Sequence, residues 1–217
     1  MATQKRDAEA TKAKIIKNSM FLFSKNGFDT TTVDDIAKES DVNKALIYYY
    51  FKNKAGLYTT TMSGLFDSIY EKIITAERCC NSATAELRSF IITYANYAEK
   101  YPYFPALLLR ELSDSGAHLP EEIFSGMRRL LILLSDILKR GEEEGVFKKS
   151  IPIVLHFMIT GSLNLLVTTK TLREKATGLE SELDTCSECS MQEIAEYIFN
   201  TVKKSLEVDN EKNIHCA

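Results

Sequence analysis

The chain has 217 residues, of which 45% are hydrophobic and 26% are charged, a balance that excludes a disordered or fibrous protein. Its net charge of −3 excludes a general binder of polyanions, although residues 1–60 carry +3 and the remainder −6. With only four prolines and nine glycines and little β-type alternation, it is predicted to be all-α, with about nine helices.

In chain order, the apolar spacing and the capping residues predict each helix in turn. The first three, at residues 6–25, from Thr31 or Thr32 to Ser40, and at 44–50, form a compact head. The longer helices that follow are expected at about 54–80 and 83–100, then from a start between Pro102 and Pro105 to about 113–116, from Pro120 to the GEEEG run at 141–145, and at about 150–176 and 190–206. A polar connection at 177–190 separates the last two helices. We therefore expect a head at 1–52, a helical domain at 53–206 and a disordered tail at 207–217.

The first residues lack the apolar core of a signal peptide, and the apolar run at 151–167 is short and polar for a membrane span. Five cysteines are an odd number with no arrangement typical of a secreted disulfide framework. We therefore expect a cytoplasmic protein with no membrane partner.

The most informative stretch is residues 28–57, which is typical of a helix-turn-helix. Its second helix ends in three consecutive tyrosines and Phe51. Hydroxyl or amide side chains begin the helices, and backbone N–H groups at such ends suit phosphates. Tyrosine can bind phosphate or stack against sugar and thymine methyl groups. The stretch predicts a surface that binds double-stranded DNA, although Tyr48 and Phe51 could instead anchor the core and Lys44 and Lys54 could simply be solvated.

The same stretch resembles the TetR/AcrR family of transcriptional regulators in both residue identity and spacing. The matching positions are Gly27-Phe28, Thr31-Thr32, Ile36-Ala37, Val42, Tyr48, Phe51, Lys54 and Leu57. The pattern departs from the family at Ala45, where glycine is usual, and at Tyr50, where histidine is usual. These departures leave the base preference open.

The resemblance implies which residues touch DNA. Phosphate contacts would come from Thr32, Asn43, Tyr49, Tyr50 and Lys54, and the helix-start pattern adds Thr31. The side chains nearest the base edges would be Lys44, Ala45, Leu46 and Tyr48.

The resemblance also implies a ligand pocket in the helices of residues 54–141 and a homodimer through the helices at 150–176 and 190–206. A two-fold dimer would read a palindromic operator. The segment at 150–176 is apolar almost all round, which fits an interface. The chain would then be a repressor released by a small, largely apolar effector. Candidate effector contacts are Phe66, Tyr70, Tyr94, Tyr97, Phe104, Leu108, Met127, Leu131 and Phe157.

Several alternatives stay open. The chain could be a helical ligand-binding or interaction module, or a redox or metal sensor that uses Cys186 and Cys189. Free thiols in a polar connection are the simpler interpretation of that pair. Arg110 and Glu111 could pair with each other, or Arg110 could meet an acidic effector. No catalytic constellation, cofactor motif or metal-binding motif is recognisable, so we expect no enzyme activity, no cofactor and no metal. His118 is expected in a loop, and His156 as a hydrogen-bonded core residue.

Overall fold

The computed structural model describes residues 2–113, 115–177, 186 and 188–208, with the side chains from residue 6 onward. All regular structure in this part of the chain is helical, which confirms the predicted all-α class. The chain divides into two compact units. The first holds residues 1–70 and 100–128, and the second holds 71–99 and 129–217. The predicted boundary at residue 52 falls inside the first unit, and the tail from residue 209 lies outside the described residues.

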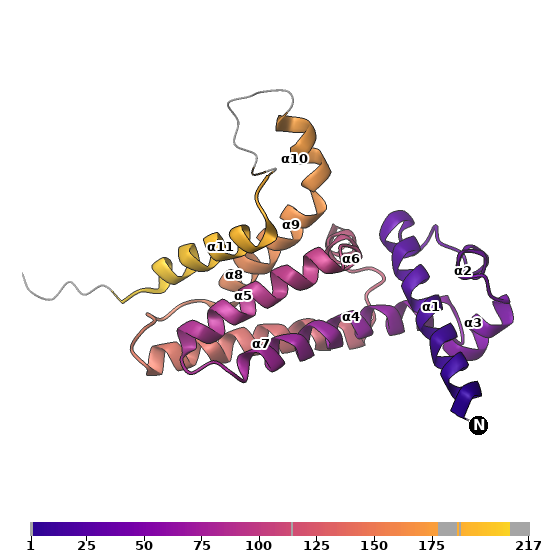
Figure 1. Ribbon diagram of the computed structural model, residues 1–217, viewed down its shortest axis with the longest axis horizontal. Coiled ribbons are helices and arrows are strands. Elements are labelled where there is room, and N and C mark those ends of the chain that lie inside the picture. The colour runs from indigo at the N-terminus through magenta and orange to yellow at the C-terminus, as the bar shows by residue number, and fades with distance from the viewer. Residues whose placement is uncertain (1, 114, 178–185, 187, 209–217) are drawn as a thin grey trace, which may run out of the picture. The chain divides into compact units, whose positions relative to one another are not determined.

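The first unit begins with three helices that pack together (Figure 1): α1 (Ala2–Asn26), α2 (Val33–Ser40) and α3 (Lys44–Phe51). To these it adds most of α4 (Lys54–Glu77), α6 (Tyr103–Ser113) and the start of α7 (Glu121–Glu143). Its core is apolar and fully buried at Ile15, Phe23, Ile36, Ile47 and Leu57. Burial of these side chains supplies the main driving force for folding the unit.

The two turns of the head are fixed by local hydrogen bonds. Thr32 begins α2 with a capping box, in which its side chain accepts from the backbone N–H of Asp35 and Asp35 accepts from the N–H of Thr32. Asp41 ends α2 in the left-handed conformation at φ 51°, and Asn43 then caps α3 by accepting from the N–H of Ala45. Such caps satisfy backbone groups that a helix end leaves unpaired. The predicted turn chemistry is therefore confirmed, with Thr32 rather than Thr31 as the cap.

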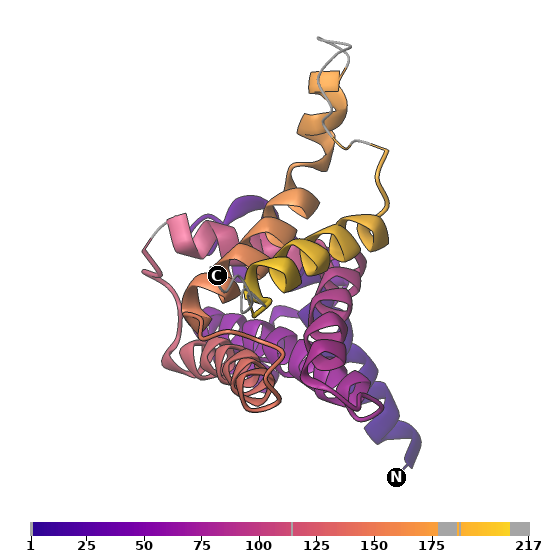
Figure 2. The same ribbon diagram turned by 90° about the vertical axis from the view of Figure 1, so that its left-hand side faces the viewer.

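The second unit contains α5 (Ala83–Lys100), the rest of α7, and a series of helices that ends with α11 (Met191–Leu206). α11 runs beside α5 (Figure 1 and Figure 2), and Arg88 of α5 donates to Glu196 of α11 at 3.0 Å. Polar links fasten this unit: Arg140 donates to Glu86 at 2.6 Å, and Glu144 accepts from the N–H of Ala83 at the start of α5. Glu144 thereby caps the start of α5 from a distant part of the chain.

The predicted continuous helix at 150–176 is wrong. The segment divides into α8 (Pro152–His156), a π-helical turn η1 (Phe157–Gly161), α9 (Ser162–Thr168) and α10 (Lys170–Thr177). A break at Thr169 bends α10 by 66° from the preceding helices. Hydroxyls at 160, 162, 168 and 169 donate to backbone carbonyls within this segment, and such bonds compete with regular helical pairing. Among the described residues, no single helix is long and apolar enough to cross a membrane, although this bent pair meets the length and composition criteria together.

Candidate DNA-binding surface and its neighbourhood

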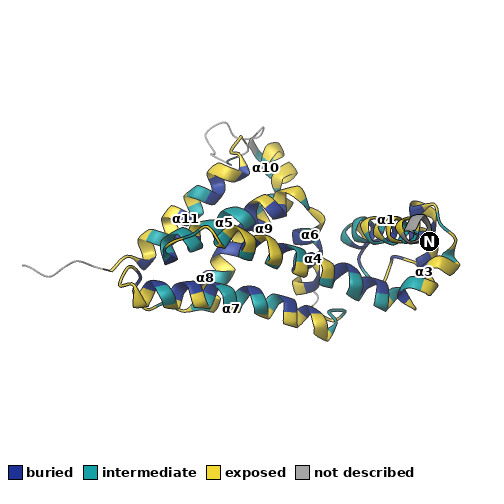
Figure 3. Ribbon diagram, turned by 60° about the horizontal axis from the view of Figure 1, so that its bottom comes forward, coloured by how far each residue is buried: buried dark blue, intermediate teal, exposed yellow. Residues whose placement is uncertain are grey.

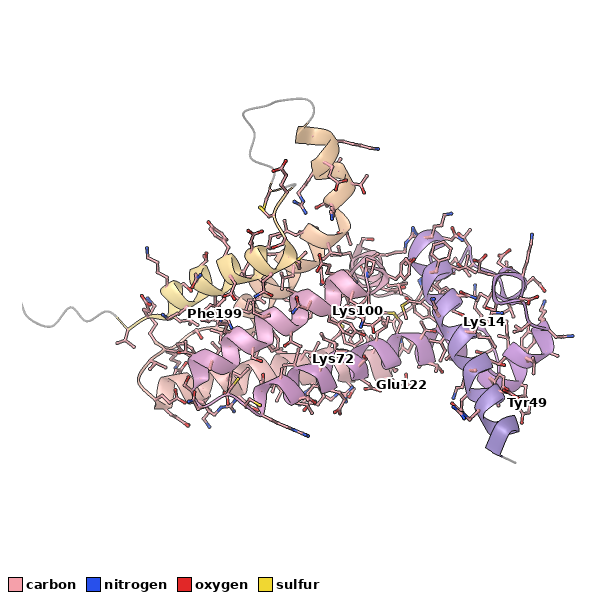
Figure 4. The ribbon with its side chains drawn as sticks, in the orientation of Figure 1. Lys14, Tyr49, Lys72, Lys100, Glu122 and Phe199 are labelled. Carbon is pink, nitrogen blue, oxygen red and sulfur yellow. A yellow bond between two sulfur atoms is a disulfide. The ribbon has the colours of Figure 1, made fainter. Side chains whose placement is uncertain are left out.

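α3 presents two chemically different faces. Ile47 and Phe51 point into the core and are almost completely buried. Leu46, Tyr48 and Tyr49 lie on the opposite side, where Tyr48 is 44% exposed and Tyr49 is 79% exposed. Tyr49 lies at the outer edge of the head (Figure 4). The fold thus buries Phe51 as a core anchor and leaves Tyr48 and Tyr49 facing outward. Tyr50 is half-buried between them.

The start of α3 carries polar and cationic groups beside these phenols. Lys44 donates from Nζ to Asp34 at 2.6 Å, and its ammonium lies 6.0 Å from the ring centre of Tyr48. The hydrogen bond to Asp34 raises the pKa of Lys44, so this side chain stays cationic. Ala45 is exposed next to it. Together these groups form a surface with hydrogen-bond donors, an ammonium group paired with Asp34, and exposed rings, which suits phosphates and base edges.

Lys54 lies differently from the expected phosphate contact. Its ammonium donates to the backbone carbonyls of Phe28 and Asp29, at 2.9 and 3.2 Å, and lies 4.3 Å from the centre of the Phe28 ring. The side chain therefore fastens the start of α4 to the loop between α1 and α2. A contact to DNA would have to compete with these internal partners.

The junction of α3 and α4 is also fixed from within. Asn53 caps α4 by accepting from the N–H of Gly56 at 2.8 Å. A Cβ atom on Gly56 would lie 2.2 Å from the carbonyl oxygen of Phe51, so only glycine permits this close approach.

Thr31 is corrected by the structure. Its side chain is fully buried, and its hydroxyl donates to the carbonyl of Gly27 at 2.7 Å. Thr31 therefore holds the α1–α2 loop together and cannot reach an external ligand through its hydroxyl. Thr32 is exposed, but its side chain is already engaged in the capping box.

Beneath this surface, α4 and α6 meet the head in an aromatic cluster. Tyr58 packs edge-on against Phe23 and Phe28, with ring centres 4.9 and 5.0 Å apart. Its hydroxyl donates to Oε1 of Glu111, a buried residue of α6. Burial, and then the bond to Glu111, raise the pKa of Tyr58, so the phenol stays protonated. No sequence pattern indicated this pair, because its members are separated by 53 residues.

Comparison with known proteins identifies the family to which this architecture belongs. The model of bacterial regulatory proteins of the tetR family matches residues 15–60, and a tetracyclin repressor-like C-terminal domain matches residues 84–186. The chain belongs to the TetR family of bacterial regulatory proteins. The resemblance seen in the sequence is thereby confirmed, and the family is one of transcriptional regulators.

Two curated TetR-type relatives match part of the chain. A probable HTH-type transcriptional regulator of Bacillus subtilis, YttP, is 28% identical over 62% of this chain and 66% of its own length. The negative regulator of the biofilm operon icaADBC in Staphylococcus aureus, IcaR, is 36% identical over 38% of this chain and 45% of its own length. The chain thus spans about half to two thirds of these relatives.

Solved TetR-type structures share the whole fold. FadR of Bacillus halodurans has a TM-score of 0.71 at 19% identity and covers 90% of this chain and 99% of its own. FadR of Bacillus subtilis, solved in complex with stearoyl-CoA, has a TM-score of 0.71 at 20% identity and covers 90% and 99%. At this level of identity the likeness establishes the fold.

The candidate effector residues of this TetR-family chain lie in both units. Most are buried, namely Phe66, Tyr94, Tyr97, Phe104 and Leu108, whereas Tyr70, Met127 and Leu131 are half-buried. Within the first unit, the Phe66 and Phe104 rings pack with centres 5.3 Å apart. Within the second, the Tyr94 hydroxyl donates to Asn164 at 3.1 Å. Phe157 differs from the others, because it is 55% exposed on η1.

The second unit exposes an apolar surface on the helices that the family resemblance assigns to dimerisation. We call it the α8–α11 face and define it by Val154, Phe157, Met158, Leu165 and Tyr197, all of which are exposed. Figure 3 shows extensive exposure on α9, α10 and α11. His156 lies beside this face, where burial lowers its pKa to about 4. Its Nδ1 atom has no hydrogen-bond partner among the described residues, which corrects the expectation of a hydrogen-bonded core histidine.

The cysteine pair of the connection before α11 also differs from the expectation of free thiols. Cys186 and Cys189 form a disulfide with their Cα atoms 5.1 Å apart. The left-handed backbone of Cys186, at φ 50°, turns the chain at this point, and its carbonyl accepts from Arg173 at 2.7 Å. Both cysteines line a groove of about 800 Å³ with Leu166, Ile194 and Tyr197. Cys79 and Cys80 are free thiols, and Cys216 lies outside the described residues.

Proposed function

We propose that this chain is a transcriptional repressor that binds a palindromic operator as a homodimer and leaves it when a small, largely apolar effector binds. The observation that carries the proposal is the outward face of α3, where Leu46, Tyr48 and Tyr49 are exposed beside the capped, cationic start of the helix. Exposed aromatic rings add little to the stability of the folded chain, whereas a helix in the major groove contacts DNA through such side chains.

The proposed DNA contacts follow the geometry. The base edges would be contacted by Lys44, Ala45, Leu46 and Tyr48. The phosphate backbone of the DNA would be contacted by Asn43, Tyr49 and Tyr50, and by Thr32 at the start of α2. Lys54 would act chiefly by positioning, because its ammonium is bound to the α1–α2 loop. Thr31 is excluded from the proposed set.

The proposed dimer would form through the α8–α11 face. Exposed apolar patches of this kind mark interfaces, and a two-fold dimer presents two α3 helices to two half-sites. Phe157 would then belong to the dimer contact rather than to an effector site. The dimer is supported by the family, while the choice of helices is our proposal.

Repression and the nature of the effector are supported by relatives. IcaR, which matches over 38% of this chain, is a negative regulator. FadR of Bacillus subtilis, which shares the fold, was solved with the long-chain thioester stearoyl-CoA. We propose an apolar effector here because eight aromatic or aliphatic candidate contacts lie buried or half-buried along the helices of residues 54–141.

The test is a fluorescence anisotropy titration of the full-length chain against palindromes near its own gene. The proposal requires binding by a dimer, with an affinity that falls steeply as salt rises. Addition of long-chain acyl thioesters or other apolar compounds should release the DNA. Absence of any specific palindrome, together with a small molecule retained in native mass spectrometry, would favour the ligand-binding module instead.

A second function, sensing of thiol oxidation, is favoured by the Cys186–Cys189 disulfide. Two thiols would lose two protons and two electrons to a peroxide, which would be reduced to water or an alcohol. The matched test compares operator affinity under dithiothreitol and under hydrogen peroxide, in the native chain and in Cys186→Ser. A redox effect on affinity that persists in the variant would exclude this pair as the sensor.

A further inference from the structure

The first unit contains a polar cavity of about 490 Å³ that the proposed function does not use. Its walls come from the loop after α1 and from the end of α6 with the turn that follows. They are formed by residues 26–30 together with Arg110, Glu111, Ser113 and His118. None of the candidate effector residues is among them, so this cavity is distinct from the proposed apolar site.

A buried carboxylate at this cavity has one oxygen with no hydrogen-bond partner among the described residues. Glu111 is only 3% exposed. Its Oε1 atom accepts from the Tyr58 hydroxyl, but its buried Oε2 atom accepts no hydrogen bond from any group of the described chain. Leaving a buried acceptor unpaired costs free energy, and more so for a charged group. A ligand in the cavity that carries a donor would remove this cost.

The adjacent residue supplies the opposite chemistry. Arg110 is exposed at the same cavity, and within the described chain its guanidinium makes one long hydrogen bond, from Nη2 to the carbonyl of Lys25 at 3.5 Å. A guanidinium is a planar fork with several donors, suited to bidentate binding of a carboxylate. One wall is closed by His118, which lies 3.2 Å from Asp29 and stacks against Phe28 with ring centres 5.1 Å apart.

We propose that this cavity binds a small zwitterion of the free α-amino acid class. Its ammonium group donates to Oε2 of Glu111, and its carboxylate accepts from the guanidinium of Arg110. A ligand with only one of the two charges would satisfy one of these residues and leave the other unbalanced. The zwitterion satisfies both without adding net charge to a partly buried site.

The position of the cavity gives its ligand a means to act on the head. Gly27 packs so closely on the Arg110 guanidinium that a Cβ atom there would lie 2.5 Å from Nη1. The loop that starts at Gly27 is tied by Thr31 to the beginning of α2. A ligand bound to both walls favours one placement of this loop relative to α6. Any effect on operator affinity rests on the proposed function, whereas ligand binding itself does not.

The test uses the full-length chain and thermal unfolding with each of the standard free L-amino acids as the probe. Methylammonium and acetate serve as probes that carry only one of the two charges. We expect at least one amino acid to raise the Tm, as a ligand of the native state must, and neither single-charge probe to do so. No shift with any amino acid, or an equal shift with methylammonium or acetate, would overturn the proposal.

Variants then assign the site. Glu111→Gln keeps an acceptor for Tyr58 but removes the negative charge, and Arg110→Gln removes the positive charge of an exposed side chain. Each should weaken amino acid binding about tenfold in calorimetry, the usual loss for a charge-assisted hydrogen bond. Glu122→Gln and Arg128→Gln, exposed residues of α7 in the same unit, are the matched controls and should bind as the native chain does. Unchanged binding in both cavity variants would show that the ligand sits elsewhere.

Operator binding is measured separately in the same variants. If the chain binds an amino acid but no palindrome, the cavity proposal stands and the proposed function fails. If it binds the palindrome but no amino acid, the reverse holds.

Discussion

The α3 surface and the α8–α11 face both expose large hydrophobic side chains, but the two surfaces differ in chemistry. α3 exposes phenols next to a cationic lysine and a capped helix start. The α8–α11 face exposes Val154, Phe157, Met158 and Leu165, which carry no hydroxyl or charge, and a single phenol, Tyr197. Rings with hydroxyl tips suit a hydrated, charged partner, whereas an aliphatic and phenyl face gains only from excluding water. The difference explains why one surface is proposed to meet DNA and the other a second copy of the chain.

The largest expected effect comes from placing a charge on the apolar face. Phe157→Asp should convert the dimer to a monomer and weaken operator binding about a hundredfold or more, because an unpaired charge buried in an interface costs about 3–5 kcal/mol. Sedimentation velocity and anisotropy measure the two effects. Phe124→Asp, at an exposed phenylalanine of α7 in the other unit, is the control. A dimer that survives Phe157→Asp would refute the proposed interface.

The next effect concerns His156, beside the same face. Because burial lowers its pKa to about 4, the unfolded chain takes up a proton at a higher pH than the folded chain. The contribution of His156 to the free energy of unfolding is complete above about pH 6.5. About 3 kcal/mol of this contribution is lost as the pH falls from about 6.5 to about 4. Urea unfolding of the native chain and of His156→Leu across this range should show the difference.

The titration of Glu77 changes the free energy of unfolding with pH in the opposite direction. The comparison of the native chain with His156→Leu is therefore needed to isolate the contribution of the histidine. Burial, and then the nearby Glu86, raise the pKa of Glu77 to about 7. Its contribution is present at low pH and declines as the pH rises from about 4.5 to about 7. A native chain and a His156→Leu variant with the same pH dependence would contradict the burial of the imidazole.

A smaller effect is expected on the α3 surface. Tyr48→Ala should weaken operator binding by about 1–3 kcal/mol, roughly tenfold to a hundredfold, and leave the dimer intact, because the ring is exposed and contributes little to the core. Anisotropy titration with the operator measures the loss, and Phe124→Ala controls for removal of an exposed ring. Unchanged affinity would remove Tyr48 from the proposed contacts.

The smallest effect separates the two lysines. Lys44→Gln should reduce the slope of log affinity against log salt by up to about 1, because it removes a positive charge that lies against the DNA. Lys54→Gln should change this slope less and should lower the Tm instead, because it breaks bonds to the α1–α2 loop. Equal slope changes in both variants would show that DNA displaces the internal partners of Lys54.

The head was predictable because its signals are local. The caps at Thr32 and Asn43 and the anchor at Phe51 depend on neighbours within a few residues, and the family pattern specifies their spacing. The break of residues 150–176 was not predictable from apolar content, since that content says that a segment is buried or paired and not where its hydrogen bonding changes. The Cys186–Cys189 bond depends on a left-handed residue that spacing alone does not reveal.

The sequence by itself determined the all-α class, the helix-turn-helix and the family, because periodicity, caps and motif spacing are properties of adjacent residues. Only the tertiary structure decided which polar groups are engaged inside the protein. It turned Thr31 inward, bound Lys54 to the α1–α2 loop, and joined Tyr58 to Glu111 across 53 residues. Long-range packing buries Oε2 of Glu111 with no hydrogen-bond partner in the described part of the chain, and no local pattern encodes that outcome.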